Sequence, residues 1–371
     1  MRESFEQGKG LNQFVRELLT ARGSTYKNPP ANYYRALRNP TDRSEATAQL
    51  FLGARLRCAK CHNHPFDRWT QDEYYQFAAL FDGIDYKIIE NKRRDGFDKN
   101  KFVGEQEVQL VNERKFKDPR SKKPPEPRLL GSETVALDRE QDRFEQLAAW
   151  ITEPGNALFP MVQANRIWFN LMGRGLVDPV DDFRPTNPST HPDLLEALAK
   201  DFVEHGCDLR HLIRRITTSR TYQLSSEPNA TNEDDGINYS RALMPRLPAE
   251  VLLDAVHTSL DRPGSFKQYK DITRAVALPG IKGTFLDGNP HHDDRFLRLF
   301  GKPPRLINSD AERLNDISLA QVFEMTSGET LSALLEMEGN RLNQLLDDEL
   351  SNEEILSTLY WTTITRTPST R

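Results

Sequence analysis

The chain has 371 residues, which is enough for two or three domains. Hydrophobic residues make up 37% of it and charged residues 28%, with a mean hydropathy of −0.68, which is typical of a globular and not a disordered protein. The formal net charge is −5, so no global positive field is present that would hold nucleic acid or an anionic membrane. No apolar run approaches the length of a membrane span.

Helical patterns dominate the first 85 residues. Apolar residues recur at the spacing of one helix face over 10–22 and predict a helix there. A second helix is predicted over about 44–57. A third begins at Thr70, which forms a capping box with Glu73 ahead of an apolar run.

The composition changes over residues 86–130, where Lys and Arg cluster with Asp, Glu and Pro. The alternation of apolar and polar residues that predicts a strand is confined to a short stretch around Val108 and Leu110. A charge run of this kind is typical of a solvated surface segment. We therefore predict an irregular excursion with at most a short hairpin.

Helical patterns return at about residue 139 and continue to the end of the chain. Their limits are marked by capping residues, such as Asp208 at a start and Gly173 and Gly206 at ends. A capping box of Ser351 and Glu354 opens the last helix. The predicted helices lie at about 144–151, 158–172, 190–205, 208–216, 248–260, 318–325, 329–337, 340–349 and 352–364.

These patterns predict a mainly α fold in two helical units joined by an irregular, charged excursion. The expected domains are 1–85 and 135–371, with the excursion at 86–134. The first helix pattern starts within a dozen residues of one end, and the last one stops just before the other. We therefore expect each domain to be truncated at its outer end, and the chain to be part of a longer polypeptide whose signal segment is not in this sequence.

The most specific chemical motif is Cys-Ala-Lys-Cys-His at residues 58–62, whereas Cys207 stands alone. Three cysteines in this arrangement are not a disulfide framework. A c-type haem needs this spacing, because two thiols add to its two vinyl groups and the next residue places an imidazole on the iron. The motif predicts a haem c site with Cys58 and Cys61 as thioether anchors and His62 as proximal ligand.

Two other interpretations of this motif stay open. Cys58, Cys61, His62 and His64 could supply four ligands to zinc, although four ligands within seven residues are cramped for a structural zinc site. The cysteines could also form a disulfide or remain a plain thiol pair. A thioredoxin-like redox site is not expected, because no strand and helix alternation surrounds the motif.

The motif does not fix the rest of a haem site. Met161 and Met172 are candidates for a sixth iron ligand by residue type only, and His64 with Pro65 more simply fixes the following turn. Aromatic residues crowd just after the motif, where they could either wall a haem pocket or belong to an ordinary core. They are Phe66, Trp69, Tyr74, Tyr75 and Phe77.

A second polar constellation lies farther along the chain. Arg166 is predicted on a helix and Arg174 just after its end, while Asp181 and Asp182 follow in the next loop. A pairing of these charges across the turn would be either a structural salt-bridge network or a site for a polar ligand or a cation, and the structural interpretation is favoured.

Residues 291–294 read His-His-Asp-Asp, which is similar to a metal-binding sequence. Two adjacent histidines beside a Gly- and Pro-rich stretch are more typical of an exposed polar turn, so we predict such a turn here. His257 is predicted on a helix without a special role.

Several ordered motifs resemble a known pair of bacterial domains. The stretch from Phe51 to Tyr75, which contains the Cys-x-x-Cys-His motif, resembles the planctomycete-type cytochrome-like domain of unknown function. Later motifs resemble its usual partner, the planctomycete-specific C-terminal domain. They are Asn165 to Trp168, Gly173 to Asp182, Ser219 to Tyr222, Arg246 to Glu250, Phe300 to Pro303 and Ser318 to Gln321.

The resemblance implies a secreted protein whose biochemical role is unestablished, often with a separate cytochrome c domain upstream. Related sequences often carry cysteines after the Phe-Gly-Lys-Pro stretch. This chain has Leu306 to Arg313 there, so a site built on such cysteines is missing or altered. Members occur in bacteria that degrade complex polysaccharides, which motivates a polysaccharide as a partner.

The leading hypothesis is therefore a periplasmic, or otherwise extracytoplasmic, c-type haem protein that acts in electron transfer. Its partner would be a redox protein or an upstream cytochrome domain. The alternative is a non-haem binding or scaffold protein, in which the motif holds zinc or shapes a turn and the C-terminal domain binds a polysaccharide or a protein. A weaker third class is a hydrolase or lyase that uses Asp181 and Asp182 with Arg166.

Overall fold

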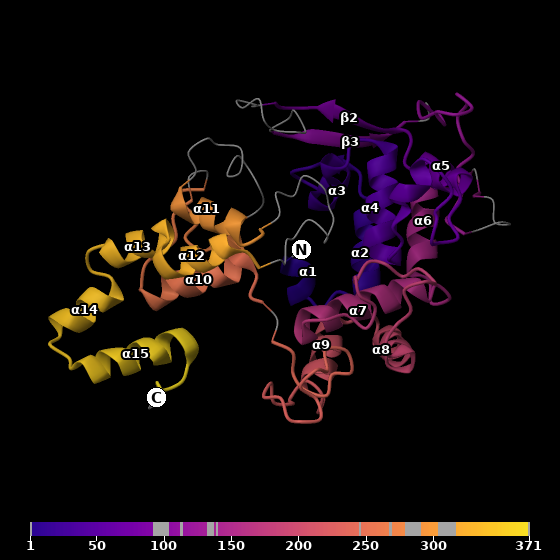
Figure 1. Ribbon diagram of the computed structural model, residues 1–371. Coiled ribbons are helices and arrows are strands. Elements are labelled where there is room, and N and C mark those ends of the chain that lie inside the picture. The colour runs from indigo at the N-terminus through magenta and orange to yellow at the C-terminus, as the bar shows by residue number, and fades with distance from the viewer. Residues whose placement is uncertain are drawn as a thin grey trace. The chain divides into compact units, whose positions relative to one another are not determined.

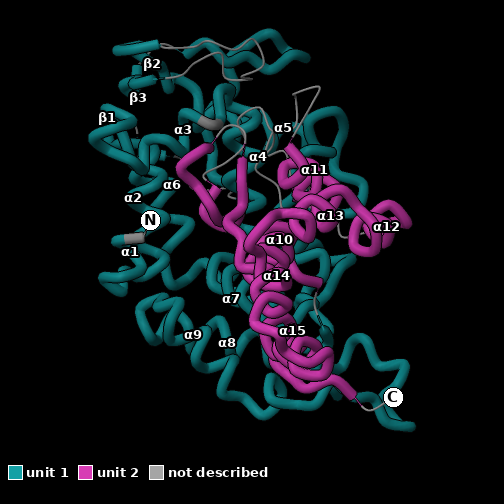
Figure 2. Tube along the Cα trace, turned by 90° about the vertical axis from the view of Figure 1, so that its left-hand side faces the viewer, with its two compact units in different colours: residues 1–94, 100–245 teal, residues 95–99, 246–371 magenta. Residues whose placement is uncertain are grey.

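The structure is a computed structural model that describes residues 2–91, 104–111, 114–131, 137–138, 140–244, 246–266, 269–278, 291–302 and 317–369. The chain divides into two compact units (Figure 2). Unit 1 comprises residues 1–94 and 100–245, and unit 2 comprises 95–99 and 246–371. This spatial division falls near residue 245, and the sequence domains of 1–85 and 135–371 stay a prediction.

Helices are the main secondary structure of unit 1 (Figure 1). The prediction of a mainly α fold is confirmed, with about 49% of the described residues in helices and 4% in strands. The helix predicted over 158–172 has the bounds expected from its sequence. The helices are α1 (Arg2–Glu6), α2 (Leu11–Thr20), α3 (Asn32–Ala36), α4 (Pro40–Leu52), α5 (Gln71–Ala79), α6 (Arg143–Thr152), α7 (Leu158–Met172), α8 (Pro192–Glu204) and α9 (Leu209–Thr217), with the short 3-10 helices η1 (Pro29–Ala31) and η2 (Leu56–Lys60).

Capping residues decide where the helices around the cysteine motif begin and end. The predicted capping box of α5 is present, since Thr70 N donates to Glu73 Oε2 at 2.8 Å and Glu73 N donates to Thr70 Oγ1 at 3.2 Å. The helix predicted over 44–57 ends earlier, at Leu52, because Gly53 takes a left-handed conformation with φ 61°. A Cβ at Gly53 would stand 2.6 Å from the ring of Phe183, so this turn requires glycine.

A small antiparallel sheet lies at one edge of unit 1, with strand order β1-β3-β2. The strands are β1 (Gly23–Ser24), β2 (Ile84–Ile88) and β3 (Gln106–Leu110). Tyr86 of β2 pairs with Val108 of β3, so the short hairpin is found where alternation predicted it. β1 was not predicted, because two residues cannot show an alternating pattern. Residues 92–103 of the predicted excursion lie outside the described residues.

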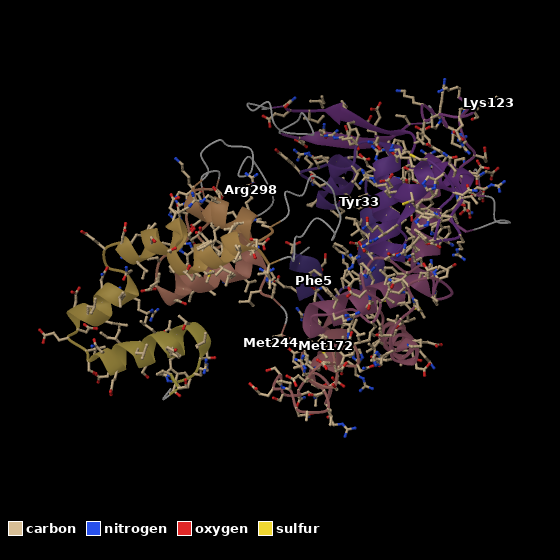
Figure 3. All side chains as sticks on the ribbon, viewed as in Figure 1. Phe5, Tyr33, Lys123, Met172, Met244 and Arg298 are labelled. Atoms are coloured by element: carbon tan, nitrogen blue, oxygen red, sulfur yellow. The ribbon has the colours of Figure 1, made fainter. Side chains whose placement is uncertain are left out.

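One apolar core runs through unit 1 and joins residues of both expected sequence domains. α2 packs on α6, and α4 packs on α7. Phe144 is fully buried and meets the rings of Tyr34 and Phe81 edge-on, at centroid distances of 5.6 and 5.9 Å. Nearby, the hydroxyl of Tyr33, labelled in Figure 3, is 2.7 Å from Thr47 Oγ1. The cysteine motif is therefore carried by a well-packed helical body.

Unit 2 is built from helices around a smaller apolar cluster, and α10 packs on both α11 and α15. The cluster consists of Ala249, Leu253, Phe266, Ala275, Leu278, Phe296 and Leu297. The helices are α10 (Ala249–Ser259), α11 (His292–Leu299), α12 (Leu319–Ser327), α13 (Glu329–Glu336), α14 (Arg341–Asp347) and α15 (Asn352–Ile364), with the 3-10 helix η3 (Ala275–Ala277).

The exposed polar turn predicted at residues 291–294 is wrong. These residues open α11, and both Asp293 and Asp294 are buried in its first turn. The ring of His291 caps this turn by accepting from Asp293 N, and Asp293 faces His257 of α10, which draws the segment inward. The stretch from Leu306 to Arg313 lies outside the described residues.

Within the described part of the chain, none of the helices has both the length and the apolar character needed to cross a lipid bilayer.

Candidate functional site

The two cysteines of the motif lie in a tight turn on the surface of unit 1. Cys58 belongs to η2, and Cys61 N donates to Cys58 O at 3.3 Å. In a 3-10 turn the side chains at positions i and i+3 eclipse one another, so both thiols project on the same side. Both cysteines are free and exposed. The turn thus offers two unpaired, exposed thiols three residues apart.

His62 follows the turn and is exposed. Its Nδ1 lies 2.8 Å from Asn63 O. A carbonyl oxygen only accepts, so Nδ1 carries the proton and the neutral ring has its lone pair on Nε2. This is the tautomer of a histidine that binds a metal through Nε2, with a backbone carbonyl fixing the ring from the other side.

The start of α5 holds the loop after the motif. Gln71 N donates to Asn63 Oδ1 at 3.0 Å, and Gln71 Nε2 donates to Lys60 O at 3.0 Å. The hydroxyl of Tyr75 donates to the same carbonyl at 3.0 Å. His64 N donates to Trp69 O at 2.8 Å, while His64 Nδ1 accepts from Phe66 N at 3.3 Å. His64 is therefore engaged in the turn, as expected for the structural role of His64 and Pro65.

The four residues of the zinc alternative are not assembled as a ligand set. In the described part of the chain, two groups of three or more His, Cys, Asp or Glu have ligand atoms within 4.8 Å of one another. Neither includes Cys58, Cys61, His62 or His64. Two exposed thiols followed by an exposed imidazole are the residue types that hold a c-type haem, whereas a group of three or more zinc ligands is not preassembled among the described residues of this turn.

The aromatic residues after the motif mostly belong to the core. Trp69, Tyr74, Tyr75 and Phe77 are buried, whereas the ring of Phe66 is 60% exposed. The four buried rings are part of the apolar core of unit 1. Of the two methionines considered as sixth ligands, Met172 is buried in the core. Met161 lines a separate pocket with Phe183.

The second polar constellation is held by an arginine next to the cysteine motif. Asp181 and Asp182 are buried. Arg55 Nε donates to Asp181 Oδ1 at 3.0 Å, and Arg55 Nη1 lies 3.7 Å from Asp182 Oδ2. Gln49 Nε2 also donates to Asp181, at 2.5 Å. Arg55 precedes Cys58 by three residues, so the two carboxylates anchor the segment that leads into the motif.

The other two predicted members of this site, Arg166 and Arg174, have different surroundings. Arg174 is 3.8 Å from Asp178, one helical turn away in sequence, and Arg166 is half-buried on α7. A second arginine reaches the acids, since Arg184 Nε lies 3.4 Å from Asp182 Oδ1. A functional role for these four residues stays a prediction.

The same segment also contacts the end of the motif loop. The guanidinium of Arg184 lies over the ring of Phe66 at 5.6 Å from its centroid. Thr186 Oγ1 donates to Phe66 O at 3.3 Å. The loop of residues 55–66 is thus held at its start by Asp181 and near its end by Arg184 and Thr186.

Two family models match the chain. One, described as PSD1, protein of unknown function (DUF1553), matches residues 143–371, which is well over half of the chain. The chain belongs to the PSD1 family. The other, described as PSCyt2, protein of unknown function (DUF1549), matches residues 1–86. The expected planctomycete cytochrome-like and C-terminal domain pair is confirmed, in that order. No curated protein and no solved structure matches the chain.

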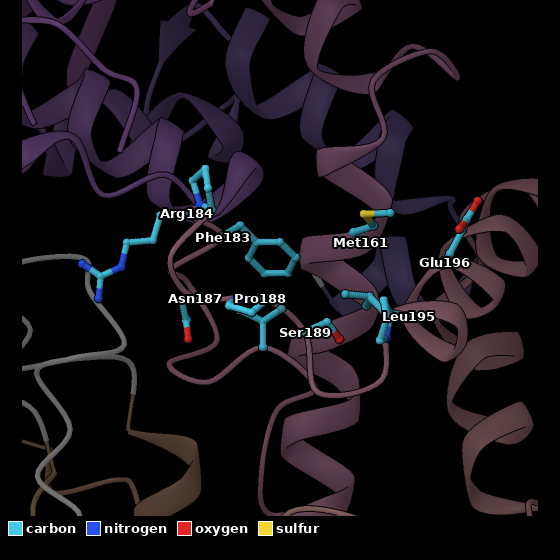
Figure 4. Close-up of a pocket in the computed structure, with 11 residues that line it drawn as sticks. Met161, Phe183, Arg184, Asn187, Pro188, Ser189, Leu195 and Glu196 are labelled. Atoms are coloured by element: carbon cyan, nitrogen blue, oxygen red, sulfur yellow. The ribbon is translucent and has the colours of Figure 1, made fainter. Parts of the chain in front are cut away.

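The PSD1 part of unit 1 also contains a pocket of about 310 Å³. Figure 4 shows the ring of Phe183 between Arg184 and Met161. Apolar walls with a few polar groups are typical of small-ligand sites. The lining residues are Met161, Val177, Phe183, Arg184, Pro185, Asn187, Pro188, Ser189, Pro192, Leu195 and Glu196.

Proposed function

We propose that this PSD1 protein carries a c-type haem at Cys58, Cys61 and His62, and exchanges electrons with a protein partner outside the cytoplasm. The main support is the state of the motif. Two free, exposed thiols lie at positions i and i+3 of a tight turn. The imidazole that follows has Nδ1 engaged by a backbone carbonyl, which leaves Nε2 available to a metal.

The chemistry asked of these residues is simple. Each thiol adds its S–H bond across one vinyl group, so a carbon–sulfur bond forms, the proton goes to the other vinyl carbon, and no oxidant or leaving group is needed. The bound haem supplies one-electron redox chemistry. His62 would bind the iron through Nε2, and its contact with Asn63 O fixes the direction of the ring.

The position of the motif favours electron exchange over catalysis in a closed pocket. Cys58, Cys61 and His62 are all exposed, and the neighbouring aromatic rings are committed to the core. A partner could therefore approach the site directly. The hydrogen bonds from Gln71 and Tyr75 to Lys60 O hold the turn in place, so the residues that would hold the haem are fixed before it binds.

An extracytoplasmic location is part of the same proposal, because covalent haem attachment normally takes place outside the cytoplasm. The confirmed family pair supports it, since the resemblance implies secretion. The redox partner would be another protein or a cytochrome domain upstream of this chain.

The test is a pyridine haemochrome spectrum of the chain exported to a periplasm that contains haem-maturation machinery. The decisive variant is Cys58→Ser/Cys61→Ser. The matched control is Cys207→Ser, which changes the one remaining cysteine, a buried one in unit 1. Circular dichroism checks that each variant folds.

We expect a c-type band that survives denaturation in the wild type and in Cys207→Ser, and that is absent from Cys58→Ser/Cys61→Ser. Absence of the band from the wild type, under conditions that load a control cytochrome, would overturn the proposal. A band that persists in the double variant would do so as well.

A second candidate function is the binding of a polysaccharide by the PSD1 part without haem, and the pocket beside Phe183 favours it. The pocket offers the ring of Phe183 for stacking and the charged groups of Arg184 and Glu196 for hydroxyls. Affinity electrophoresis in polysaccharide gels tests this. Retardation should be lost in Glu196→Ala and kept in Glu204→Ala, which changes an exposed glutamate on the same helix.

A further inference from the structure

A group of imidazole and carboxylate side chains lies at the start of α11 in unit 2. His291, His292 and Asp293 each offer one ligand atom, and these atoms all lie within 4.8 Å of one another. Asp293 is fully buried, and both histidines are half-buried. The haem proposal uses none of these residues.

The carboxylate of Asp293 is fixed in one direction by its neighbours. Ser265 N donates to Asp293 Oδ2 at 2.8 Å. On the other side, Nε2 of the buried His257 lies 3.0 Å from Asp293 Oδ1. The ring of His257 is itself held, because its Nδ1 lies 3.2 Å from Arg262 O. Contacts of this kind orient the ligating carboxylates and imidazoles of metal sites.

One nitrogen of the group lacks a hydrogen bond. His292 Nδ1 is buried and lies 2.9 Å from Asp293 Oδ1, but the ring is not oriented to donate to that oxygen. It has no other hydrogen-bond partner within the described residues. A metal ion bound to both atoms would replace this poorly aligned contact.

The distances between these ligand atoms agree with binding to a single ion. Nitrogen and oxygen ligands lie about 2.0–2.2 Å from zinc, so neighbouring ligand atoms stand about 2.9 Å apart at a right angle and about 3.4 Å apart at the tetrahedral angle. The distance of 2.9 Å between His292 Nδ1 and Asp293 Oδ1 falls at the lower of these values. The ligand atom of the half-buried His291 lies within 4.8 Å of the other two. A rotation of its ring, which gives up the 3.4 Å contact from Asp293 N, would bring this atom to the same ion.

The local charge also suits a cation. The start of a helix carries about +0.5 of an elementary charge, which by itself repels metal ions. The carboxylate of Asp293 is buried in the same first turn, and its full negative charge exceeds this partial positive charge. The backbone of His292 is also fixed, because Thr330 Oγ1 donates to His292 O at 3.2 Å.

We propose that His291, His292 and Asp293 bind one divalent transition-metal ion, with zinc the first ion to test. His257 and the amide of Ser265 act as positioning groups for the carboxylate. Imidazole and carboxylate ligands suit zinc and its neighbours in the first transition series. Three protein ligands leave one position for water, which is the arrangement of open zinc sites.

The test is zinc affinity of the full chain after removal of metals by a chelator, measured by competition with a chromophoric chelator. His292→Gln removes a ligand and should weaken zinc binding by more than about 100-fold, while His257→Gln should weaken it by about 10- to 100-fold. The matched control is His205→Gln, which alters the other group in the described residues, Asp201, His205 and His211. It should leave the affinity unchanged.

Cobalt supplies a readout on the unaltered chain. Co²⁺ at the proposed site should give visible absorption bands without the thiolate charge-transfer band that ligation by Cys58 or Cys61 would add. The proposal is overturned if the wild type binds no zinc, if His205→Gln and not His292→Gln abolishes binding, or if a thiolate band accompanies the single bound cobalt.

Discussion

Unit 1 and unit 2 differ in how much apolar surface they bury relative to polar groups. Unit 1 encloses a continuous apolar core in which aromatic rings such as Tyr34, Phe81 and Phe144 meet edge-on. Unit 2 has a small apolar cluster beside a buried polar network of His257 and Asp293. Part of its apolar surface stays outside, since Leu319 is 78% exposed.

The difference assigns different tasks to the two units. An exposed motif can act as a fixed anchor only if the body that carries it is rigid, and unit 1 derives that rigidity from apolar burial. Unit 2 depends more on directional polar contacts, which respond to ions and to pH. Four predictions test this contrast, from the largest effect to the smallest.

The first prediction compares one phenyl ring in each core. Phe144→Ala should lower the free energy of unfolding of unit 1 by about 3–5 kcal/mol, because it leaves a cavity in a tightly packed region. Phe296→Ala in unit 2 should cost less, because a thinner core collapses more readily around the gap. Hydrogen exchange along a urea series measures both units separately. Equal losses of unfolding free energy in the two variants would contradict the proposed difference between the two cores.

The second prediction concerns the anchor of the cysteine loop. Asp181→Asn removes the charge that faces Arg55 and should cost unit 1 about 2 kcal/mol, because a charged hydrogen bond to a buried carboxylate is lost. Asp178→Asn is the control, since its partner Arg174 is 3.8 Å away and both are partly exposed. It should cost less than about 1 kcal/mol. Chemical denaturation checks both, and a smaller loss in Asp181→Asn than in the control would contradict the anchoring role.

The third prediction is an alkaline weakness of unit 1. Burial raises the pKa of Tyr33, Tyr34 and Tyr74 well above the ordinary value of 10.0. The folded state therefore keeps protons that the unfolded chain releases. The stabilisation is complete below about pH 10 and falls as the pH rises further, by up to about 1.4 kcal/mol per tyrosine for each pH unit.

Denaturant unfolding between pH 9 and pH 12, followed by circular dichroism, measures this slope. Tyr74→Phe removes one titrating group and should make the slope shallower. An unchanged slope in Tyr74→Phe would show that Tyr74 does not titrate in this way.

The fourth prediction uses the same capping motif in both units. Ser351→Ala and Thr70→Ala each remove a side chain that accepts from the third residue of a helix, so each should cost about 1 kcal/mol. The two variants should affect different parts of the molecule. Thr70→Ala should increase hydrogen exchange around Lys60 and Asn63, because α5 holds the motif loop, whereas Ser351→Ala should act on α15 alone.

Local signals in the sequence predicted much of the fold. The capping boxes at Thr70 and Ser351 and the glycine after Met172 are short-range features, and the helices beside them were found. The helix α11 was missed, because a run of polar residues at its start indicates a turn unless tertiary contacts are known. The contact that decides it joins His257 and Asp293, which are 36 residues apart.

The candidate site, too, could be predicted only as far as local patterns in the sequence reveal it. The spacing of Cys58, Cys61 and His62 is visible in the chain, and so is the pair of acids at Asp181 and Asp182. The role of Arg55 was not visible, because Asp181, to which it donates, lies 126 positions away. The sequence pattern could not show whether Trp69 and Phe77 belong to the core or wall a pocket, because an aromatic side chain is buried in either case.

The most direct test of the central claim is peptide mass mapping of the exported chain, produced with haem-maturation machinery. The haem proposal predicts that the peptide containing Cys58, Cys61 and His62 gains the mass of one haem, with Cys207 recovered unmodified. Recovery of the motif peptide with both thiols free, beside a fully loaded control cytochrome, would contradict it.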